Sequence, residues 1–335
     1  MKVHLLALVA VLGLGLVTAC GDDNGGAAAN GQGGKVRAVG VGSADFSSLD
    51  LTEWQRLLKT ENVDFELKFL EEADATLRAV VAGAADMYIG DINAAVTAIK
   101  NTKAPVKVIA ANTQSTDYVV LARKGINSIN DLAGKTIGVN TPGSAGDVIM
   151  KMALTKQGYD VDKSKYVVIG GTSARVAALT AGQIDATVAH FADAQAAIAT
   201  GNFVALVECG PALGGLLQTG LIASTAWLDK NPELAQKVVD RLIDASRWAT
   251  KDKAGYLKRS EEFNDKLKPE VKEAAYDTFV SIKYFGVNGG LDTDQVDNYV
   301  SLFQTAGVLP KDMPAKGDWL DDKYVKNYLE RNGRV

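Results

Sequence analysis

A stretch of this chain recurs about one hundred residues later, and this repeat constrains the fold more than any other feature of the sequence. Residues 69–86 align without a gap on residues 168–185 at an offset of 99. The alignment continues to Asp91, which lies over His190. A chain that uses one unit twice is expected to build two similar lobes, each with a strand, a helix, a strand, a polar group at that strand's end and a helix.

Each copy of the unit alternates strand-like and helix-like patterns. Strands are expected where β-rich residues alternate or form short apolar runs, and helices where apolar residues recur at helical spacing. Alternation of this kind predicts an α/β fold with mainly parallel sheets flanked by helices. In the first copy, strands are expected at residues 36–41, 63–70, 86–90 and 106–111, and helices at 49–59, 73–81 and 92–100.

The length of 335 residues also favours two domains. We interpret two apolar runs, residues 117–122 and 220–223, as strands that cross between the lobes. A long helix is predicted from Asn231-Pro232-Glu233 to about residue 250, because Pro is favoured in the first turn. The expected division places residues 36–116 and 223–335 in the first lobe, and residues 117–222, with the crossover strands, in the second.

Composition excludes several function classes. Lys and Arg total 36 and Asp and Glu total 40, so the formal net charge is −4. A mildly acidic chain is poorly suited to binding a phosphate backbone, and nucleic acid is not expected as a partner. Two cysteines and two histidines leave little for a metal site, and no catalytic motif is present. We therefore predict no metal, no cofactor and no enzymatic activity.

The first twenty residues predict where the protein resides. Residues 5–17 are apolar but too few to span a bilayer, and they fit a secretory signal. Small residues followed by Cys20 resemble a bacterial lipobox, which implies a signal peptide at residues 1–19 and lipidation of Cys20. Residues 20–35 are rich in Gly, Ala and Asn and are expected to form a flexible tether. An ordinary signal with an accidental Cys, or an N-terminal anchor, is the alternative.

Three segments carry a resemblance to a known family. Residues 129–139 and 177–186, followed by Asn231-Pro232-Glu233, resemble the NMT1/THI5-like and SsuA/TauA branch of ABC-transporter substrate-binding proteins. The resemblance implies the two-lobed periplasmic-binding-protein (type II) fold, with two crossover segments and a ligand bound between closing lobes. It also implies an ABC permease as partner. A monomer is expected, lipid-anchored in a bacterial cell envelope and facing outside the cytoplasm.

Candidate binding residues follow from the strand ends. Ligands of open parallel sheets bind beyond the carboxyl ends of the strands, where helix N-termini favour anions. Several candidates have plain structural alternatives: the hydroxyl residues and Asp91 as helix caps, Phe46 as a core residue, Arg175 as an exposed helix residue and His190 as a core histidine. The predicted ligand-binding set is Ser43, Asp45, Phe46, Asp91, Thr116, Thr141, Gly143, Ser144, Thr172, Arg175 and His190.

The helix N-termini, the hydroxyl groups and Arg175 favour a small organic anion, a sulfonate or carboxylate, with an aromatic body as one option. Asp45 and Asp91 disfavour a polyanion and could instead hold an amine or a ring N–H. A thiamine-type pyrimidine is the alternative ligand. A pyrimidine-forming enzyme and a sensor domain of the same fold are the alternative functions, and the enzyme fits less well because Cys209 is isolated in the sequence.

Overall fold

The computed structural model describes residues 34–41, 46–70, 73–262 and 267–335. The expected signal peptide, Cys20, nearly all of the expected tether, Ser43 and Asp45 lie outside these residues. Lys35, expected in the tether, is already the first residue of strand β1 (Lys35–Val41). None of the described helices is long and apolar enough to span a membrane.

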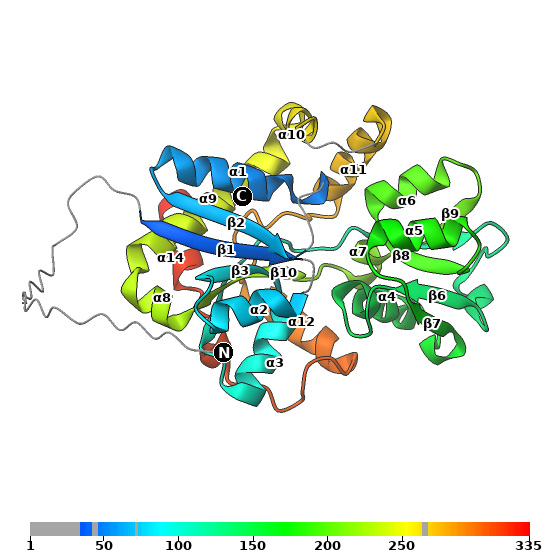
Figure 1. The fold of residues 1–335 in the computed structure, drawn as a ribbon, viewed down its shortest axis with the longest axis horizontal. Helices are drawn as coiled ribbons and strands as arrows, with labels where there is room; N and C mark the ends of the chain where they lie inside the picture. Colours follow the sequence, from blue (N-terminus) through cyan, green and yellow to red (C-terminus); the bar gives the residue numbers. More distant parts are fainter. Residues whose placement is uncertain (1–33, 42–45, 71–72, 263–266) are drawn as a thin grey trace, which may run out of the picture. The chain divides into compact units, whose positions relative to one another are not determined.

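The first of two five-stranded sheets contains β1 and four further strands in the order β2-β1-β3-β10-β4 (Figure 1). β1 pairs in parallel with both β2 and β3, whereas β10 is antiparallel to β3 and β4. The strands are β2 (Asp64–Leu70), β3 (Met87–Asp91), β4 (Val106–Ala111) and β10 (Thr219–Ser224). The associated helices are η1 (Phe46–Ser48), α1 (Leu49–Thr60), α2 (Ala73–Val81) and α3 (Ile92–Thr102).

The second sheet repeats this design in the order β7-β6-β8-β5-β9, with β5 as its antiparallel strand. β6 pairs in parallel with β7 and β8. The strands are β5 (Tyr118–Arg123), β6 (Thr136–Val139), β7 (Lys165–Val168), β8 (Ala186–His190) and β9 (Phe203–Glu208). The helices are η2 (Ile129–Leu132), α4 (Ala145–Lys156), η3 (Val161–Lys163), α5 (Thr172–Thr180) and α6 (Phe191–Ile198). The predicted α/β class is confirmed.

The repeat is present in three dimensions. Helices α2 and α5, and strands β3 and β8, have the same lengths and begin 99 residues apart. An aspartate before each of these strands forms the same bond in both sheets. The Asp86 carboxylate accepts the backbone N–H of Arg37 at 2.7 Å, and the Asp185 carboxylate accepts that of Thr136 at 2.9 Å. In each lobe this bond fixes the start of one strand beside its parallel neighbour.

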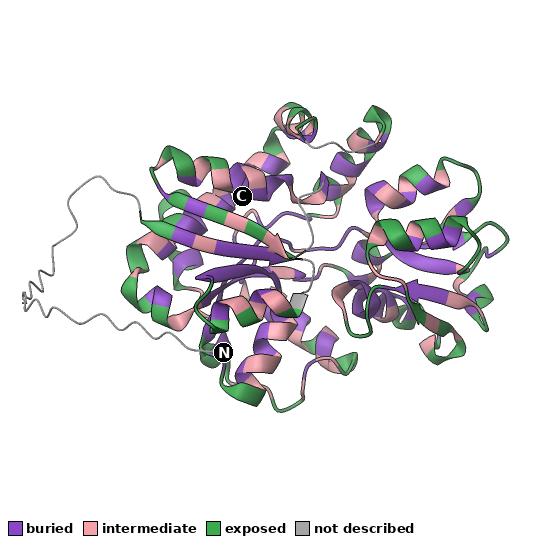
Figure 2. Ribbon diagram, viewed as in Figure 1, coloured by how far each residue is buried: buried purple, intermediate pink, exposed green. Residues whose placement is uncertain are grey.

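Burial follows the same layering. The strands β3 and β8 are largely purple in Figure 2, whereas the flanking helices show green, exposed faces. Helix α9 packs against α1 and α14, and the indole N–H of Trp54 donates to the carbonyl of Val238 at 2.9 Å. The remaining helices are α7 (Cys209–Leu213), α8 (Thr225–Lys230), α9 (Pro232–Lys251), α10 (Lys253–Ser260), α11 (Pro269–Ser281), α12 (Thr293–Thr305), α13 (Lys316–Trp319) and α14 (Lys323–Asn332).

Two segments connect the sheets, residues 112–117 and 214–218. The backbone N–H of Leu216 donates to the carbonyl of Gln114 at 2.9 Å, and the N–H of Gly286 donates to that of Asn112 at 2.7 Å. A Cβ at Gly286 would lie 2.2 Å from the carbonyl oxygen of Ala111, so only glycine fits this approach. The crossovers thus pair with each other and with a third segment from the C-terminal half.

One expected boundary is wrong. A division at residue 222 assigned most of β10 to the second lobe, but β10 pairs with β3 and β4 throughout its length and completes the first sheet. We therefore use "first lobe" for the sheet that contains β10 with its helices, and "second lobe" for the sheet that contains β5. The change of lobe occurs before the strand, in residues 214–218.

Candidate functional site

In the second lobe, three helices begin where parallel strands end. Helices α4, α5 and α6 follow β6, β7 and β8, so their N-termini lie at the carboxyl edge of the sheet (Figure 1). Seven of the predicted site residues belong to this lobe or to the crossover that leads into it: Thr116, Thr141, Gly143, Ser144, Thr172, Arg175 and His190.

The loop before α4 contains one backbone N–H that is hydrogen-bonded within the protein and one hydroxyl that has no hydrogen-bond partner among the described residues. Gly143 has φ +80°, and its N–H donates to the carboxylate of Asp147 at 2.9 Å. That N–H is therefore bound by the protein's own carboxylate. Ser144 occupies the N-cap position without a capping bond, and its buried hydroxyl has no hydrogen-bond partner among the described residues. Thr141 is exposed beside it.

Arg175 is neither exposed nor ion-paired within the part of the chain that the structure describes. Its side chain is 3% exposed, and its guanidinium donates to the carbonyl of Val188 at 3.0 and 3.2 Å and to the hydroxyl of Thr172 at 3.1 Å. A further N–H donates to the carbonyl of Gly170. Burial lowers the pKa of Arg175, and the nearby Tyr118 and Asp193 partly oppose this shift. The result is a desolvated positive charge, most of whose N–H groups are already used.

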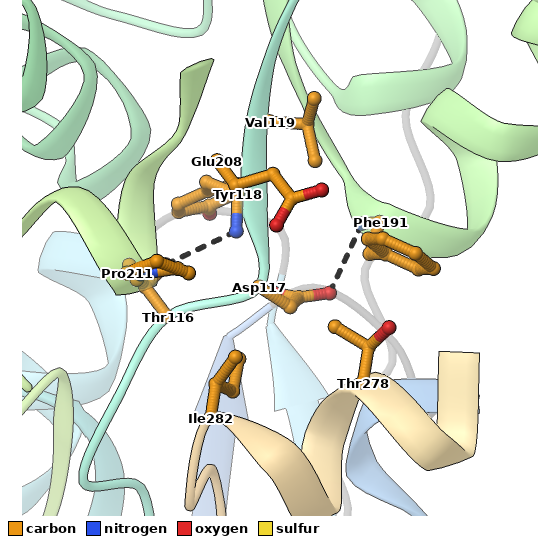
Figure 3. A pocket seen from close by; sticks show the side chains of 10 residues that line it. Thr116, Asp117, Tyr118, Val119, Phe191, Glu208, Pro211, Thr278 and Ile282 are labelled. Carbon is orange, nitrogen blue, oxygen red and sulfur yellow. Dashed lines mark hydrogen bonds between the residues drawn. The ribbon is translucent and has the colours of Figure 1, made fainter. Parts of the chain in front are cut away.

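His190 ends β8 beside a buried carboxylate from the crossover. Its Nδ1 lies 2.9 Å from one carboxylate oxygen of Asp117, and the other oxygen accepts the backbone N–H of Phe191 at 3.2 Å. Thr116 is 1% exposed, and its hydroxyl accepts the N–H of Tyr118 at 3.3 Å. Figure 3 shows Thr116, Asp117, Tyr118 and Phe191 around a cavity of about 10 Å³, which is room for about one water molecule.

Tyr118, which was not predicted, connects these groups. Its ring lies against that of His190 in a tilted arrangement, with centroids 4.6 Å apart and an interplanar angle of 34°. A Cβ at Gly146, in the first turn of α4, would lie 3.7 Å from its hydroxyl, and Tyr118 also acts on the pKa of Arg175. One side chain from β5 thus contacts or influences all three helix N-termini. Its place as the first residue of a crossover strand was the signal that could have identified it.

In the first lobe, Asp91 is the counterpart of His190. It has the extended backbone of an N-cap, with φ −65° and ψ 121°, but its carboxylate makes no capping bond. Burial raises the pKa of Asp91 to about 6. Thr219 pairs with Asp91 across the sheet, and its hydroxyl is shared with Thr113 and Asn112. Sequence reasoning missed this network because its members lie far apart in the chain.

Phe46 lies in the core. It is 4% exposed, with ring centroids 5.4 Å from Tyr256 and 5.9 Å from Phe279, and its carbonyl accepts the hydroxyl of Tyr256. Its side chain is packed away from solvent, which matches the alternative considered for it. Cys209 is also fully buried, and burial raises the pKa of its thiol to about 12, which makes the nucleophilic thiolate scarce at neutral pH.

Two other kinds of site compete poorly with the strand ends. The described residues contain no cluster of three His, Cys, Asp or Glu placed to hold a metal ion. A wider hollow of about 390 Å³ lies among α1, α9 and α10. There Glu53 is already paired with both Arg56 and Arg259, so the buried charge in this hollow is satisfied.

Comparison with known proteins gives the family. Residues 57–254 match the family model described as NMT1/THI5 like. A Brucella abortus (strain 2308) protein, provisionally named a binding protein, is 30% identical over 131 residues, which is 39% of each chain. The match therefore spans about two-fifths of that relative's length.

Solved structures agree on the fold. The alkanesulfonate-binding protein SsuA from Xanthomonas axonopodis pv. citri, bound to MOPS, has a TM-score of 0.68 at 20% identity, covering 87% of this chain and 100% of that one. The ligand-binding component of an ABC-type import system from Staphylococcus aureus, with zinc bound, has a TM-score of 0.71 at 14% identity and covers 88% and 98%. The desulfurization enzyme DszB has a TM-score of 0.62 at 15% identity and covers 88% and 99%.

These neighbours share the periplasmic-binding-protein fold that the two sheets and paired crossovers display, and the family match covers more than half of the sequence. The chain belongs to the NMT1/THI5-like family.

Proposed function

We propose that this protein is the solute-binding component of an ABC importer and that it captures a small organic anion, a sulfonate or carboxylate. Family membership supports a binding role, and two of the structural neighbours are named as binding components of this kind. An aromatic body on the ligand remains compatible with the proposal, because Val41 and Val168, at the ends of β1 and β7, are 38% and 58% exposed.

The observation that carries the proposal is the buried charge of Arg175. A desolvated cation is costly unless charge or dipoles compensate it. Here the hydrogen-bond partners are neutral carbonyl and hydroxyl oxygens, and the charge of Asp193 opposes the effect of burial only in part. An anion at the adjacent strand ends would add further negative charge beside Arg175. Because most of the N–H groups of Arg175 are used, we expect it to act mainly through its field, and the bidentate pairing expected from the sequence would require some of these bonds to break.

The direct donors would then be other groups. The Ser144 hydroxyl has no partner within the described chain. The backbone N–H groups in the first turns of α4 and α5 point along their helix axes toward the same edge of the sheet, where the helix dipoles favour an anion. Thr172 already bonds Arg175 and would link the anion to the buried charge. Ligand binding would shift a pre-existing equilibrium toward a closed arrangement of the lobes.

The location and partners of the protein form part of this proposal. We expect residues 1–19 to be removed, Cys20 to carry lipid and the binding body to face outside the cytoplasm as a monomer. A membrane permease would receive the ligand. A pyrimidine ligand is the alternative within the same site. The neighbour DszB is named as an enzyme, so the fold also occurs in enzymes. For this chain we propose binding without turnover, because Cys209 is buried and the pKa of its thiol is raised.

A thermal-shift screen of the purified protein against sulfonates, carboxylates, oxyanions and pyrimidines tests the ligand class. True ligands raise the melting temperature with concentration, by mass action. Each hit should then be titrated against Arg175→Met and against Lys165→Met, which removes an exposed cation on β7. Loss of binding in Arg175→Met alone is expected. Equal affinity in both variants, or conversion of the hit into a product, would contradict the proposal.

A further inference from the structure

The loop before α4 adjoins a negative charge that the proposed function leaves unexplained. Asp147, the third residue of α4, is 3% exposed, and its carboxylate accepts the backbone N–H of Gly143 at 2.9 Å. The helix dipole stabilises an acid in the first turn, so this carboxylate occupies a position that also favours a bound anion. Its charge therefore bears on which anions the proposed site accepts.

Lys151 accompanies this carboxylate one turn further along α4. Its Nζ lies 2.8 and 3.1 Å from the two carboxylate oxygens of Asp147 and 4.4 Å from the ring centroid of Tyr166. The Lys151 side chain is 34% exposed and the Asp147 side chain 3%, so solvent screens the positive end of this pair more than the negative end. The charge of Asp147 also acts beyond the pair, because burial raises the pKa of Tyr166 and both Tyr159 and Asp147 raise it further. The pair is thus electrically uneven, with its negative end buried beside the loop.

The same loop keeps hydrogen-bond donors for a small anion. The buried hydroxyl of Ser144 has no partner within the described ranges, and the first N–H groups of a helix have no acceptor inside that helix. Asp147 uses none of these donors, because its bond is to Gly143, which precedes them. A ligand head can therefore bind here without displacing Asp147, and it then meets both the donors and the negative charge.

The number of charges on the ligand head decides the balance of forces. Arg175 attracts a doubly charged head twice as strongly as a singly charged one, but Asp147 also repels it twice as strongly. The second charge gains no further donor from the loop, and it makes the head costlier to remove from water. A singly charged head meets the smaller repulsion and loses less hydration.

We propose that Asp147 is a specificity-determining residue, through which the anion site selects a singly charged head over a doubly charged head of the same shape. This inference rests on the proposed function for the site itself. Lys151 weakens the selection, because it neutralises part of the charge of Asp147. The ligand class narrows accordingly to monoanions, and dianions with the shape of sulfate or phosphate are excluded.

Calorimetric titration of the purified protein with methanesulfonate and sulfate tests this selection. The two anions share a tetrahedral head and differ by one charge, because a methyl group in the first replaces an oxygen of the second. At pH 8 the wild type should bind methanesulfonate more tightly than sulfate by roughly tenfold or more, the order expected for one extra charge. Comparison between variants removes the effect of the methyl group itself.

Three variants are compared with the wild type. Asp147→Asn keeps an oxygen that accepts the Gly143 N–H but loses the charge, so the preference for methanesulfonate should fall by about tenfold. Lys151→Met leaves the charge of Asp147 unopposed, so the preference should increase. Asp162→Asn removes an exposed carboxylate of the same lobe, on η3, and should leave the preference unchanged.

The outcomes separate this inference from the proposed function. Opposite changes of the preference in Asp147→Asn and Lys151→Met would support the inference, since a purely structural role changes the affinities for both anions equally. An unchanged preference in these variants, or tighter binding of sulfate by the wild type, would overturn it while the anion function survives. If Asp147→Asn fails to fold, as its melting curve reports, Lys151→Met decides alone. Binding of neither anion to any variant would contradict both proposals for heads of this shape.

Discussion

The same position of the repeat holds an acid in the first lobe and a histidine in the second. Asp86 and Asp185, five residues earlier in each copy, accept the same backbone N–H bond and perform the same structural task. Asp91 and His190 differ, because His190 lies 2.9 Å from Asp117 whereas the Asp91 carboxylate makes no capping bond to the helix that follows it. The comparison teaches that the copies preserve what builds a sheet and diverge where the strands end.

The charged groups at the two strand ends differ accordingly. Helices begin at this edge in both lobes, but the second lobe adds the buried Arg175, with Asp117 held against His190. The first lobe presents the Asp91 carboxylate, with Thr219 as its cross-strand neighbour. Substitutions at Arg175, Asp91 and the paired aspartates Asp86 and Asp185 test how far this difference extends.

The largest effect is expected from Arg175→Met. The change leaves the carbonyls of Val188 and Gly170 without their donor, and unsatisfied buried groups cost roughly 1–3 kcal/mol each, so the free energy of unfolding should fall by about 2–4 kcal/mol. Urea unfolding measures this loss. Arg175→Lys should recover the charge but few of the bonds, and so only part of the stability. A fully stable Arg175→Met protein would show that these bonds contribute little.

An opposite and smaller effect is expected from Asp91→Asn. The folded-state pKa of Asp91 is raised to about 6, so the native protein binds this proton more tightly than the unfolded chain does. The contribution of Asp91 to stability is therefore fully present below the unfolded pKa of about 4 and is lost as the pH rises through about 6. Without ligand, Asp91→Asn should be more stable than the wild type by about 1–3 kcal/mol at pH 7.5.

The pH series is the control for that prediction. At pH 4 the wild-type carboxyl is protonated in the folded state, so the stability difference between wild type and Asp91→Asn should nearly vanish. Melting curves between pH 4 and 8 report the difference directly. A constant difference across this range would mean that Asp91 is ordinarily ionised and not destabilised by burial.

The smallest effect is the difference in stability expected between substitutions of the two equivalent aspartates, Asp86 and Asp185. Asp86→Ala removes the backbone bond and the ion pair with Arg37, whereas Asp185→Ala removes the backbone bond. The Arg37 side chain is 41% exposed, so solvent screens the ion pair and the extra loss should be only about 0.5 kcal/mol. Denaturation at low and high salt measures it, because salt weakens the pair. A larger loss for Asp185→Ala would show that the copies are not equivalent even here.

Much of the fold could be predicted, because local hydrophobic patterns identify the helices and strands and the repeat assigns them to two similar units. Helix α2 and strand β4 have the bounds that their patterns predict, and α5 follows α2 at the offset of 99. The pairing of β10 could not be predicted. The apolar residues of a strand indicate that the strand is buried, but they do not indicate which strands it pairs with. The lobe boundary at residue 222 was wrong for this reason.

The candidate site was predicted less completely, since side-chain direction and distant partners decide it. Arg175 was expected at a strand end, but nothing in its sequence neighbourhood shows that it turns inward to Val188. Asp117 lies 73 positions from His190, and Thr219 lies still farther from Asp91, so no local pattern links them. Phe46 satisfied an apolar pattern that fits a core and a ligand wall equally well.

Because the antiparallel strand occupies a different position in the chain order of each sheet, the two sheets can be completed at different times during synthesis. In the second sheet β5 precedes β8 and β9, so every strand has been made once residue 208 has left the ribosome. In the first sheet β10 lies between β3 and β4, which were made more than one hundred residues earlier. During that interval β3 and β4 have unpaired edges, a state prone to wrong association. The synthesis of the first lobe begins first, but its sheet is completed later. This lobe therefore depends more on chaperones that cover its unpaired strand edges before β10 is made.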